Sequence, residues 1–268
     1  MVAEASAREV RYDLALALDR VAWCEERLGF EPDEWQRDLL NSGSKRILLN
    51  CSRQSGKSTC AALLSLHTAI YKAGSLSIIA APSERQSKEL MTKVTNYATR
   101  LGLGLTRNPK DAVRKMSVEL PTGSRIEALP GTERSIRGFS KVELLVLDEA
   151  ARIDDSLYHA VRPMLSVSQG SLIMLSTPWG RRGVFFEEFV EGGPEWERFE
   201  IPASAVPRIS SEFLEEERRS LPARVYRQEY ENSFEDVEDQ LFSYEDIKAS
   251  VDEEILPILI PGALGGDV

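Results

Sequence analysis

One short segment restricts the fold of this chain more than any other. Residues 51–58 have the sequence Cys-Ser-Arg-Gln-Ser-Gly-Lys-Ser, preceded by an apolar run at 46–50 and followed by an apolar-faced helical pattern at 57–71. A strand that ends in such a loop and continues as a helix suits a bound phosphate group, because backbone N–H groups and a helix N-terminus converge on one anion. The segment therefore predicts a nucleotide-binding α/β domain.

The same order of apolar run, turn and helix is found further along the chain. Apolar runs without polar alternation are typical of a mostly parallel sheet that is covered by helices on both faces. We therefore expect an α/β fold with such a central sheet. Its elements are expected to be strands at 46–50, 76–81, 144–147 and 172–175, helices at 57–71 and 83–101, and a hairpin of 118–120 with 125–129.

The residues before the loop predict two helices. Residues 8–28 combine charged and apolar side chains at helical spacing, so we expect one amphipathic helix there. Asp33 suits the N-cap of a second helix that ends near Leu40, because its carboxylate can accept hydrogen bonds from the first free backbone N–H groups. We assign both helices to the same domain as the sheet.

The composition changes after residue 193. A strand-like segment at 199–201 leads into charged helical patterns at 210–220 and 222–232, which contain few large apolar residues. We interpret this region as a small lid subdomain. We expect residues 1–193 to form a core with an N-terminal helical segment, residues 194–245 to form the lid subdomain, and residues 246–268 to form a linker.

The overall composition excludes some functions and leaves others open. The 268 residues carry a net charge of −10, which argues against a broad DNA-binding face, although a local basic strip can still contact phosphates. No apolar run approaches the roughly 18 residues that a membrane helix needs. The three cysteines and two histidines form no spaced cluster of the kind that binds zinc or iron.

The loop assigns roles to individual side chains. Gly56 lets the backbone approach a phosphate closely, Lys57 is expected to reach the β and γ oxygens of ATP, and the Ser58 hydroxyl to bind Mg²⁺. Cys51 stands where such loops usually have their first glycine. The alternative is a solvated helix start with Lys57 as a surface cation, which the flanking apolar segments disfavour. The other loop residues expected to bind the nucleotide are Ser52, Arg53, Gln54, Ser55 and Thr59.

An acidic pair follows another apolar strand. Asp148 and Glu149 come directly after the four aliphatic residues 144–147. Because ligands of parallel sheets lie beyond the carboxyl ends of the strands, we expect the pair to face the phosphate loop. Asp148 is then expected to hold Mg²⁺ through water, together with Ser58, and Glu149 to orient and polarise the attacking water. A pair of surface acids is the alternative, and the buried strand before it disfavours that interpretation.

Two further features complete the expected phosphate chemistry. Ser176 and Thr177 end the next apolar strand, where their hydroxyls can sense the γ-phosphate, although an ordinary strand-to-turn sequence explains them equally well. A guanidinium is also expected, because charge develops on the γ-phosphoryl group during its transfer. The candidates are Arg137, its neighbour Arg134, and Arg53 within the loop.

Gln36 is the candidate for recognition of the base. Its amide offers one donor and one acceptor, which matches the Watson–Crick edge of adenine. The alternative is a glutamine on a helix surface beside Trp35 in the core, and the sequence leaves the two open.

Taken in chain order, these motifs resemble the ATPase half of the large terminase of tailed bacteriophages, the motor that packages DNA into capsids. The resemblance extends from about Pro32 to Phe234. Terminase loops are similar in lacking the glycine that Cys51 replaces here. The resemblance rests on Pro-Asp-Glu-Trp-Gln at 32–36, the loop at 52–58, Arg137-Gly138, Asp148-Glu149-Ala150 and Ser176-Thr177-Pro178.

The resemblance implies a RecA-like P-loop NTPase core with a small C-terminal lid subdomain. It further implies that hydrolysis of ATP, with Mg²⁺, drives double-stranded DNA into a procapsid. In the ring of subunits that it implies, Arg137 acts on the ATP of a neighbour. The implied partners are other copies of the chain, the DNA, the procapsid portal and the small terminase subunit, in the host cytoplasm and without a membrane.

The family also carries a nuclease domain after its ATPase half. Residues 246–268 are expected to form a linker towards that domain, with Asp267 as its first metal-binding acid, so we expect no nuclease activity from this chain. Two other functions stay open, a nucleic-acid helicase and an assembly scaffold that binds ATP without turnover. A strand-displacement assay distinguishes the helicase, and Glu149 disfavours the scaffold, because a pure binding protein needs no acid to activate water.

Overall fold

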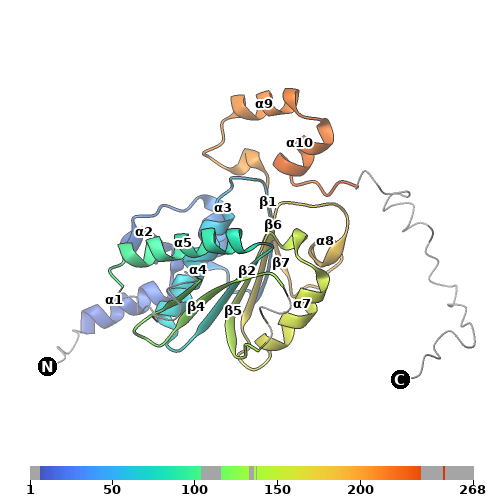
Figure 1. Ribbon diagram of the computed structural model, residues 1–268. Helices are drawn as coiled ribbons and strands as arrows, with labels where there is room; N and C mark the ends of the chain where they lie inside the picture. Colours follow the sequence, from blue (N-terminus) through green and yellow to red (C-terminus); the bar gives the residue numbers. More distant parts are fainter. Residues whose placement is uncertain (1–6, 104–115, 133–135, 137, 237–249, 251–268) are drawn as a thin grey trace, which may run out of the picture. The chain divides into compact units, whose positions relative to one another are not determined.

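A seven-stranded sheet lies at the centre of the structure (Figure 1). The computed structural model describes residues 7–103, 116–132, 136, 138–236 and 250. Neighbouring strands follow the order β3-β4-β2-β5-β6-β1-β7, and only the pair β3 and β4 is antiparallel. The strands are β1 (Arg46–Cys51), β2 (Leu76–Ala81), β3 (Ser117–Glu119), β4 (Arg125–Pro130), β5 (Val142–Asp148), β6 (Ser171–Ser176) and β7 (Glu197–Ile201).

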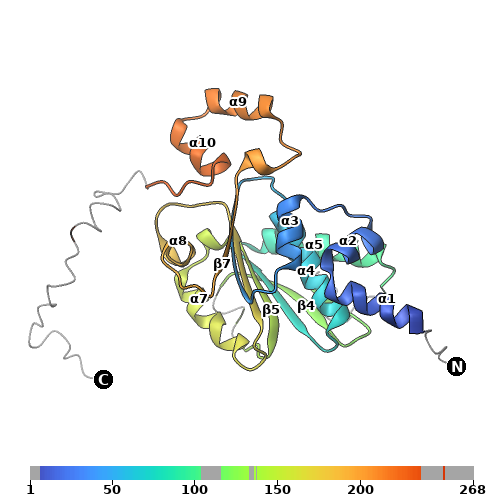
Figure 2. The same cartoon turned by 180° about the vertical axis from the view of Figure 1, so that it is seen from behind.

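Helices cover both faces of this sheet (Figure 1, Figure 2). Successive side chains of β1 alternate between two apolar cores: Ile47 and Leu49 belong to one, and Leu48 to the other. Both faces are therefore buried, which explains why the strands are apolar throughout. The first core is covered by α2 (Arg20–Leu28), α3 (Glu34–Asn41), α4 (Lys57–Tyr71) and α5 (Glu84–Arg100), and the second by α7 (Asp155–Val161) and α8 (Gly183–Val190).

The predicted α/β architecture is confirmed in class and in most of its elements. Helix α4 and strand β2 have the predicted bounds, and β3 and β4 form the predicted hairpin. Ser83 caps α5, because its hydroxyl accepts a hydrogen bond from the Gln86 N–H at 3.3 Å. The two short helices α7 and α8 were not predicted, since each spans only about two turns and gives a weak periodic signal.

The prediction of one helix over 8–28 is wrong. The structure has α1 (Ala7–Leu18) and α2, separated at Asp19, whose backbone is extended at φ −117°. The Asp19 carboxylate accepts hydrogen bonds from the second and third backbone N–H groups of α2, those of Val21 and Ala22, each at 3.0 Å. At Asp19 the chain therefore starts a new helix and does not continue the first one. By contrast, Asp33 precedes α3 as predicted and forms a capping box with Gln36.

The segment predicted as a lid begins inside the sheet. Strand β7 pairs in parallel with β1, and the helices α9 (Ser211–Ser220) and α10 (Ala223–Tyr230) follow it. All of these elements belong to the unit Met1–Glu235, and the limits of the lid and linker stay a prediction. Of the helices that the structure describes, none is both long and apolar enough to cross a bilayer.

Two buried asparagines join the segment after α10 to β1. The Asn50 side chain donates to the Asn232 carbonyl at 2.8 Å, and the Asn232 side chain donates to the Asn50 carbonyl at 3.1 Å. Their exposed fractions are 0% and 1%, so water cannot replace either bond easily. Asn232 has φ +58°, a left-handed conformation that asparagine tolerates better than most residues. This pair fixes the end of the helical segment directly to the strand that leads into the loop.

We expect Asn232→Ala to destabilise the protein more than Asn232→Gly. Both variants lose the side-chain bond to Asn50, which costs about 1–3 kcal/mol when a buried polar group is left unpaired. Alanine also meets the left-handed backbone strain, about 1–2 kcal/mol more, which glycine avoids. Urea unfolding of the three proteins measures both differences. Equal stability of the two variants would contradict the role assigned to the backbone conformation.

Candidate active site

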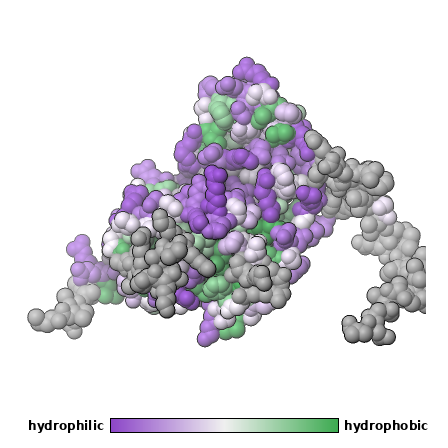
Figure 3. Space-filling view, in the orientation of Figure 1, coloured by the Kyte–Doolittle hydropathy of each residue, from purple (hydrophilic) through white to green (hydrophobic). Residues whose placement is uncertain are grey.

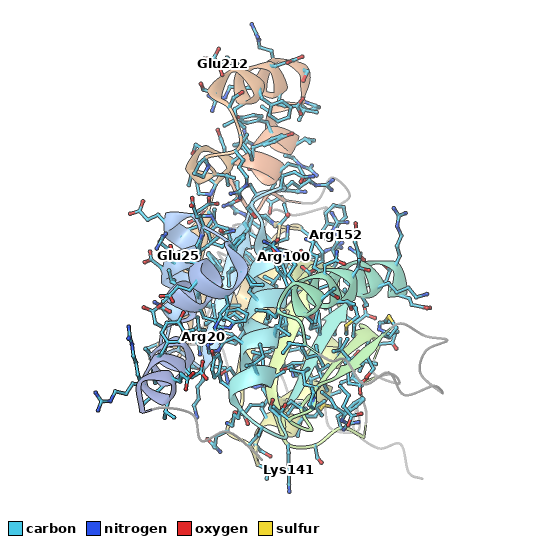
Figure 4. All side chains as sticks on the ribbon, turned by 90° about the vertical axis from the view of Figure 1, so that its left-hand side faces the viewer. Arg20, Glu25, Arg100, Lys141, Arg152 and Glu212 are labelled. Carbon is cyan, nitrogen blue, oxygen red and sulfur yellow. The ribbon has the colours of Figure 1, made fainter. Side chains whose placement is uncertain are left out.

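Three strand ends bring the predicted motifs together. Strand β6 lies between β1 and β5, with Asn50 opposite Ser176 and Leu175 opposite Asp148. The phosphate loop follows β1, the acidic pair ends β5, and Thr177 follows β6 between them. Figure 4 shows this end of the core from the side, with Arg152 near it and Lys141 at the opposite end. Motifs spread over more than a hundred residues thus share one edge of the sheet.

The loop depends on left-handed backbone at two residues. Gln54 has φ +60°, and Gly56, directly before α4, has φ +99°. A Cβ atom at Gly56 would lie 2.8 Å from Nε2 of Gln36, which is too close without a shift. The backbone conformation therefore favours glycine at this position, and a larger residue would also have to displace the Gln36 amide.

The start of the loop is held between neighbouring segments. The Ser52 N–H donates to the Ile201 carbonyl at the end of β7, at 3.0 Å. The Ser52 hydroxyl is buried and has no hydrogen-bond partner among the described residues. The Ser55 hydroxyl is likewise buried without a partner among the described residues, and because Ser55 lines the cavity, an anion bound there would satisfy it. This observation fits a phosphate group in the loop.

The Lys57 ammonium connects the three motifs. Its Nζ lies 3.3 Å from the Thr177 hydroxyl and 3.3 Å from Oε1 of Glu149. Only 8% of Lys57 is exposed, so the alternative of a surface cation at a helix start does not describe it. A buried ammonium needs such partners, since its desolvation is costly. The phosphate loop, the end of β6 and the acidic pair therefore form one polar group.

Asp148 and Ser58 form the second polar contact of the site. The Ser58 hydroxyl donates to Oδ2 of Asp148 at 3.3 Å, and the Glu149 N–H donates to Oδ1 at 3.0 Å. Burial, and secondarily the charge of Glu149, raise the pKa of the Asp148 carboxyl from 3.8 to about 6. The Asp148 and Ser58 oxygens are of the hard type that Mg²⁺ prefers. A cation beside them would stabilise the charged form of the Asp148 carboxylate, which burial disfavours. These two residues therefore fit the magnesium that the sequence predicts.

Glu149 has an unusual backbone for its residue type. Its φ is +52°, in the left-handed region, and it precedes the short 3₁₀ turn Ala150–Arg152. Strain of this kind costs roughly 1–3 kcal/mol and is frequent at functional sites. About a fifth (21%) of its side chain is exposed, so the carboxylate can reach solvent as well as Lys57.

A cavity of about 820 Å³ adjoins these groups. Its volume lies within the range of roughly 300–1,000 Å³ that is typical of ligand sites. On the face that Figure 3 presents, hydrophilic residues gather at the upper end of the core, where the strands end. The lining consists of residues 53–59 of the loop, of Pro82, Gln86, Glu89 and Lys93 at and within α5, and of Glu149, Arg152 and Thr177.

Three other predicted residues have contacts within the chain, and of these Arg53 also lines the cavity. Nε of Arg53 lies 2.5 Å from the Glu229 carboxylate in α10, so this guanidinium is engaged with the lid segment. Gln36 is 2% exposed, and its Oε1 accepts from the Asp33 N–H at 3.0 Å. Ser176 is fully buried and donates to the Thr177 carbonyl at 2.7 Å. Adenine recognition by Gln36 stays a prediction, and its amide serves the capping box in this structure.

The remaining predictions lie where the structure gives no description. Arg134 and Arg137 are outside the described residues, as is Asp267. Their roles as catalytic arginine and as first metal-binding acid of a nuclease domain therefore stay predictions.

Two arginines near the site were not predicted. Arg208, between β7 and α9, donates to the Ser55 carbonyl of the loop at 2.8 Å. Arg152 lines the cavity, and its guanidinium lies 3.7 Å from the ring centre of Trp179. No motif marks Arg208, whereas the position of Arg152 shortly after the acidic pair could have suggested it.

The comparisons with known proteins agree with one another. A family model described as terminase large subunit, T4likevirus-type, N-terminal, matches residues 48–249. The terminase large subunit of Thermus phage G20c is 27% identical over an alignment of 252 residues that covers 81% of this chain and 52% of that protein. The chain thus spans about half the length of the curated relatives it matches.

Solved structures with the same fold are also terminases. The ATPase domain of the Thermus phage P74-26 large terminase superposes with a TM-score of 0.69 at 24% identity, over 78% of this chain and 96% of that one. The large terminase of a thermophilic bacteriophage, in complex with ADP, gives a TM-score of 0.59 at 14% identity, over 82% and 53% of the two chains. At these identities the likeness concerns the fold, which is that of terminase ATPase domains.

We expect Asp148→Asn to stabilise the protein in the absence of Mg²⁺. The raised pKa means that the charged Asp148 carboxylate is less favourable in the folded state than in the unfolded state. A shift of about two pKa units corresponds to roughly 3 kcal/mol at most. We therefore expect the variant to gain about 1–3 kcal/mol in free energy of unfolding at pH 7. The gain should shrink as the pH falls from about 6 towards 3.8, because the folded wild type then takes up the proton. Urea unfolding in EDTA at pH 7 and pH 4.5 measures it.

Asp154→Asn is the matched control for this experiment. Asp154 is exposed and stands at the N-cap of α7, a position that asparagine also suits, so little change is expected. A loss of stability for Asp148→Asn at pH 7 would contradict the unfavourable burial of its charge.

Proposed function

Since residues 48–249 match its N-terminal model, the chain belongs to the terminase large subunit family, and we propose that it is an ATPase that drives double-stranded viral DNA into a procapsid. The observation that carries this proposal is the position of the Lys57 ammonium, 3.3 Å from both Thr177 and Glu149. A phosphate-binding cation, a hydroxyl and a candidate base are thereby joined at one cavity. This is the set of groups that hydrolysis of a phosphoanhydride requires.

In the proposed reaction, the loop binds the phosphates of ATP. Backbone N–H groups at the start of α4 donate to the β-phosphate, and Lys57 donates to the β and γ oxygens. The γ-phosphate competes with Glu149 for the Lys57 ammonium and thereby releases the Glu149 carboxylate. Glu149 then orients the attacking water and accepts its proton, while Thr177 contacts the γ-phosphate.

Ser58 and Asp148 are the residues that would hold Mg²⁺. When bound there, Mg²⁺ would supply positive charge that offsets the negative charge of the phosphates. The role of the chain's own residues is to fix the two oxygen ligands: the Glu149 N–H orients the Asp148 carboxylate, and α4 carries Ser58.

The wider motor function is also a proposal. We infer a ring of identical subunits on double-stranded DNA, in which Arg137 of one subunit completes the ATP site of the next. Because Arg53 is engaged with Glu229 of its own chain, Arg137 is favoured over Arg53 for this role, with Arg134 as the neighbouring candidate. The procapsid portal and the small terminase subunit are the proposed further partners, in the host cytoplasm.

Substitutions in the site test the proposed ATPase. Lys57→Ala is expected to weaken ATP binding and abolish turnover, because the phosphate oxygens lose their cation. Glu149→Gln is expected to bind ATP normally but hydrolyse it about 10²–10⁴-fold more slowly, because the amide cannot accept a proton. Steady-state turnover and equilibrium ATP binding are measured in parallel. Lys88→Ala, which removes an exposed α5 cation paired with Glu84, is the control. If all variants turn over like the wild type, the site assignment is wrong.

The dependence of turnover on protein concentration tests the proposed ring. If Arg137 acts on a neighbouring subunit, turnover per subunit should rise as the protein is concentrated, and Arg137→Ala should remove that rise. The loss at saturation should be about 10³-fold or more, as is typical of an arginine that neutralises transferred phosphate. Turnover that is independent of concentration would instead indicate a site that is complete within one chain.

A further inference from the structure

One arginine outside the motifs connects two parts of the site. Arg208 donates through Nη1 to both carboxylate oxygens of Asp33, at 2.8 and 2.7 Å, and through Nη2 to the Ser55 carbonyl at 2.8 Å. Asp33 caps α3, and Ser55 belongs to the phosphate loop. A planar guanidinium suits such a double contact, because its fixed fork of donors can bind a carboxylate and still present a further N–H.

The contact with Ser55 has a consequence for the next residue. In a trans peptide the carbonyl oxygen of one residue and the N–H of the next point in opposite directions. Arg208 holds the Ser55 carbonyl, and thereby directs the Gly56 N–H to the other side of the chain. Gly56 immediately precedes α4, where the backbone N–H groups have no acceptor within the helix.

Two side chains lie close to the Cα of Gly56. A Cβ atom on Gly56 would lie 2.8 Å from Nε2 of Gln36 and 3.3 Å from Nη2 of Arg208. Both groups therefore pack against the Cα of Gly56 and limit rotation of the peptide. The loop conformation is thus fixed from outside by α3 and by the segment before α9.

Stability alone does not account for this arrangement. The side chains of Arg208 and Asp33 are 52% and 11% exposed, and an ion pair whose cation is largely in solvent adds only on the order of 1 kcal/mol to folding. The contact between Arg208 and the Ser55 carbonyl instead fixes the orientation of the peptide group between Ser55 and Gly56. Such control has value mainly where a ligand must be met at a defined angle.

We propose that Arg208 is a positioning residue for the nucleotide phosphates. It aims the Gly56 N–H at the β-phosphate by holding the Ser55 carbonyl, and Asp33 holds Arg208 in turn. The inference rests on the proposed ATPase function. It adds that Arg208, in the segment between β7 and α9, makes the site prefer nucleoside diphosphates and triphosphates over monophosphates.

The affinities for ADP and AMP test this role. Competition against a fluorescent ATP analogue is measured for the wild type, Arg208→Ala, Arg208→Lys and Arg218→Ala. Arg208→Ala is expected to weaken ADP binding about tenfold, which corresponds to 1.4 kcal/mol, and to leave AMP binding unchanged. Arg208→Lys should recover only part of the loss, since an ammonium lacks the fork. Arg218→Ala breaks a comparable ion pair with Glu231 away from the loop and should leave the ADP to AMP affinity ratio unchanged.

A second variant separates the charge of Asp33 from its capping role. Asparagine is as good an N-cap as aspartate, so Asp33→Asn should preserve α3 while it weakens the hold on Arg208. The ADP to AMP affinity ratio is expected to fall less than in Arg208→Ala. A melting temperature measured for each variant monitors the fold.

The possible outcomes distinguish this inference from the proposed function. If the wild type binds neither ATP nor ADP, the proposed function fails and the positioning role fails with it. If the wild type binds both and Arg208→Ala keeps the wild-type ADP to AMP ratio, only the positioning role is overturned. An equal loss of affinity for ADP and AMP also overturns it, because a general loosening of the fold would then explain the effect.

Discussion

The burial of one ammonium group is the constraint on which the rest of the structure depends. Lys57 is 8% exposed, and a charge removed from water to this extent needs acceptors close by. Those acceptors are Thr177 and Glu149, which are far from Lys57 in the sequence. In this sheet β6 lies between β1 and β5, and the ends of β6 and β5 bring both acceptors within 3.3 Å of the ammonium. The strand order thereby supplies the partners that the buried charge needs.

The features that could be predicted from the sequence are those encoded by neighbouring residues. The bounds of α4 and β2 follow from apolar periodicity within each segment, and the capping box at Asp33 follows from a residue type next to a helix start. The grouping of the loop with the acidic pair could also be expected, because both lie after strands, at the same edge of a parallel sheet. Gly56 is explained more fully by the structure, where Gln36 occupies the space of a side chain.

What could not be predicted depends on competition or on distance. Asp19 fits the helical spacing of its neighbours as well as it fits a cap, and its hydrogen bonds to the start of α2 are seen only in the structure. Arg208 lies 153 residues from the carbonyl that it contacts, and a lone arginine between Pro207 and Ile209 carries no local signal. Strand β7 was grouped with the lid, because an edge strand is half exposed and lacks the continuous apolar character of β1.

The position of β7 also bears on how copies of this protein can meet. It is the last strand of the described sheet on the side of β1, so the backbone of its outer edge is not paired within the sheet. An edge of this kind invites a strand from another molecule, which leads to aggregation unless something opposes it. Here Glu197, Arg198 and Glu200 occupy three of its five positions, and charged side chains discourage such pairing. The edge therefore disfavours a continuous intermolecular sheet, and any contact between copies of this chain is left to side-chain surfaces.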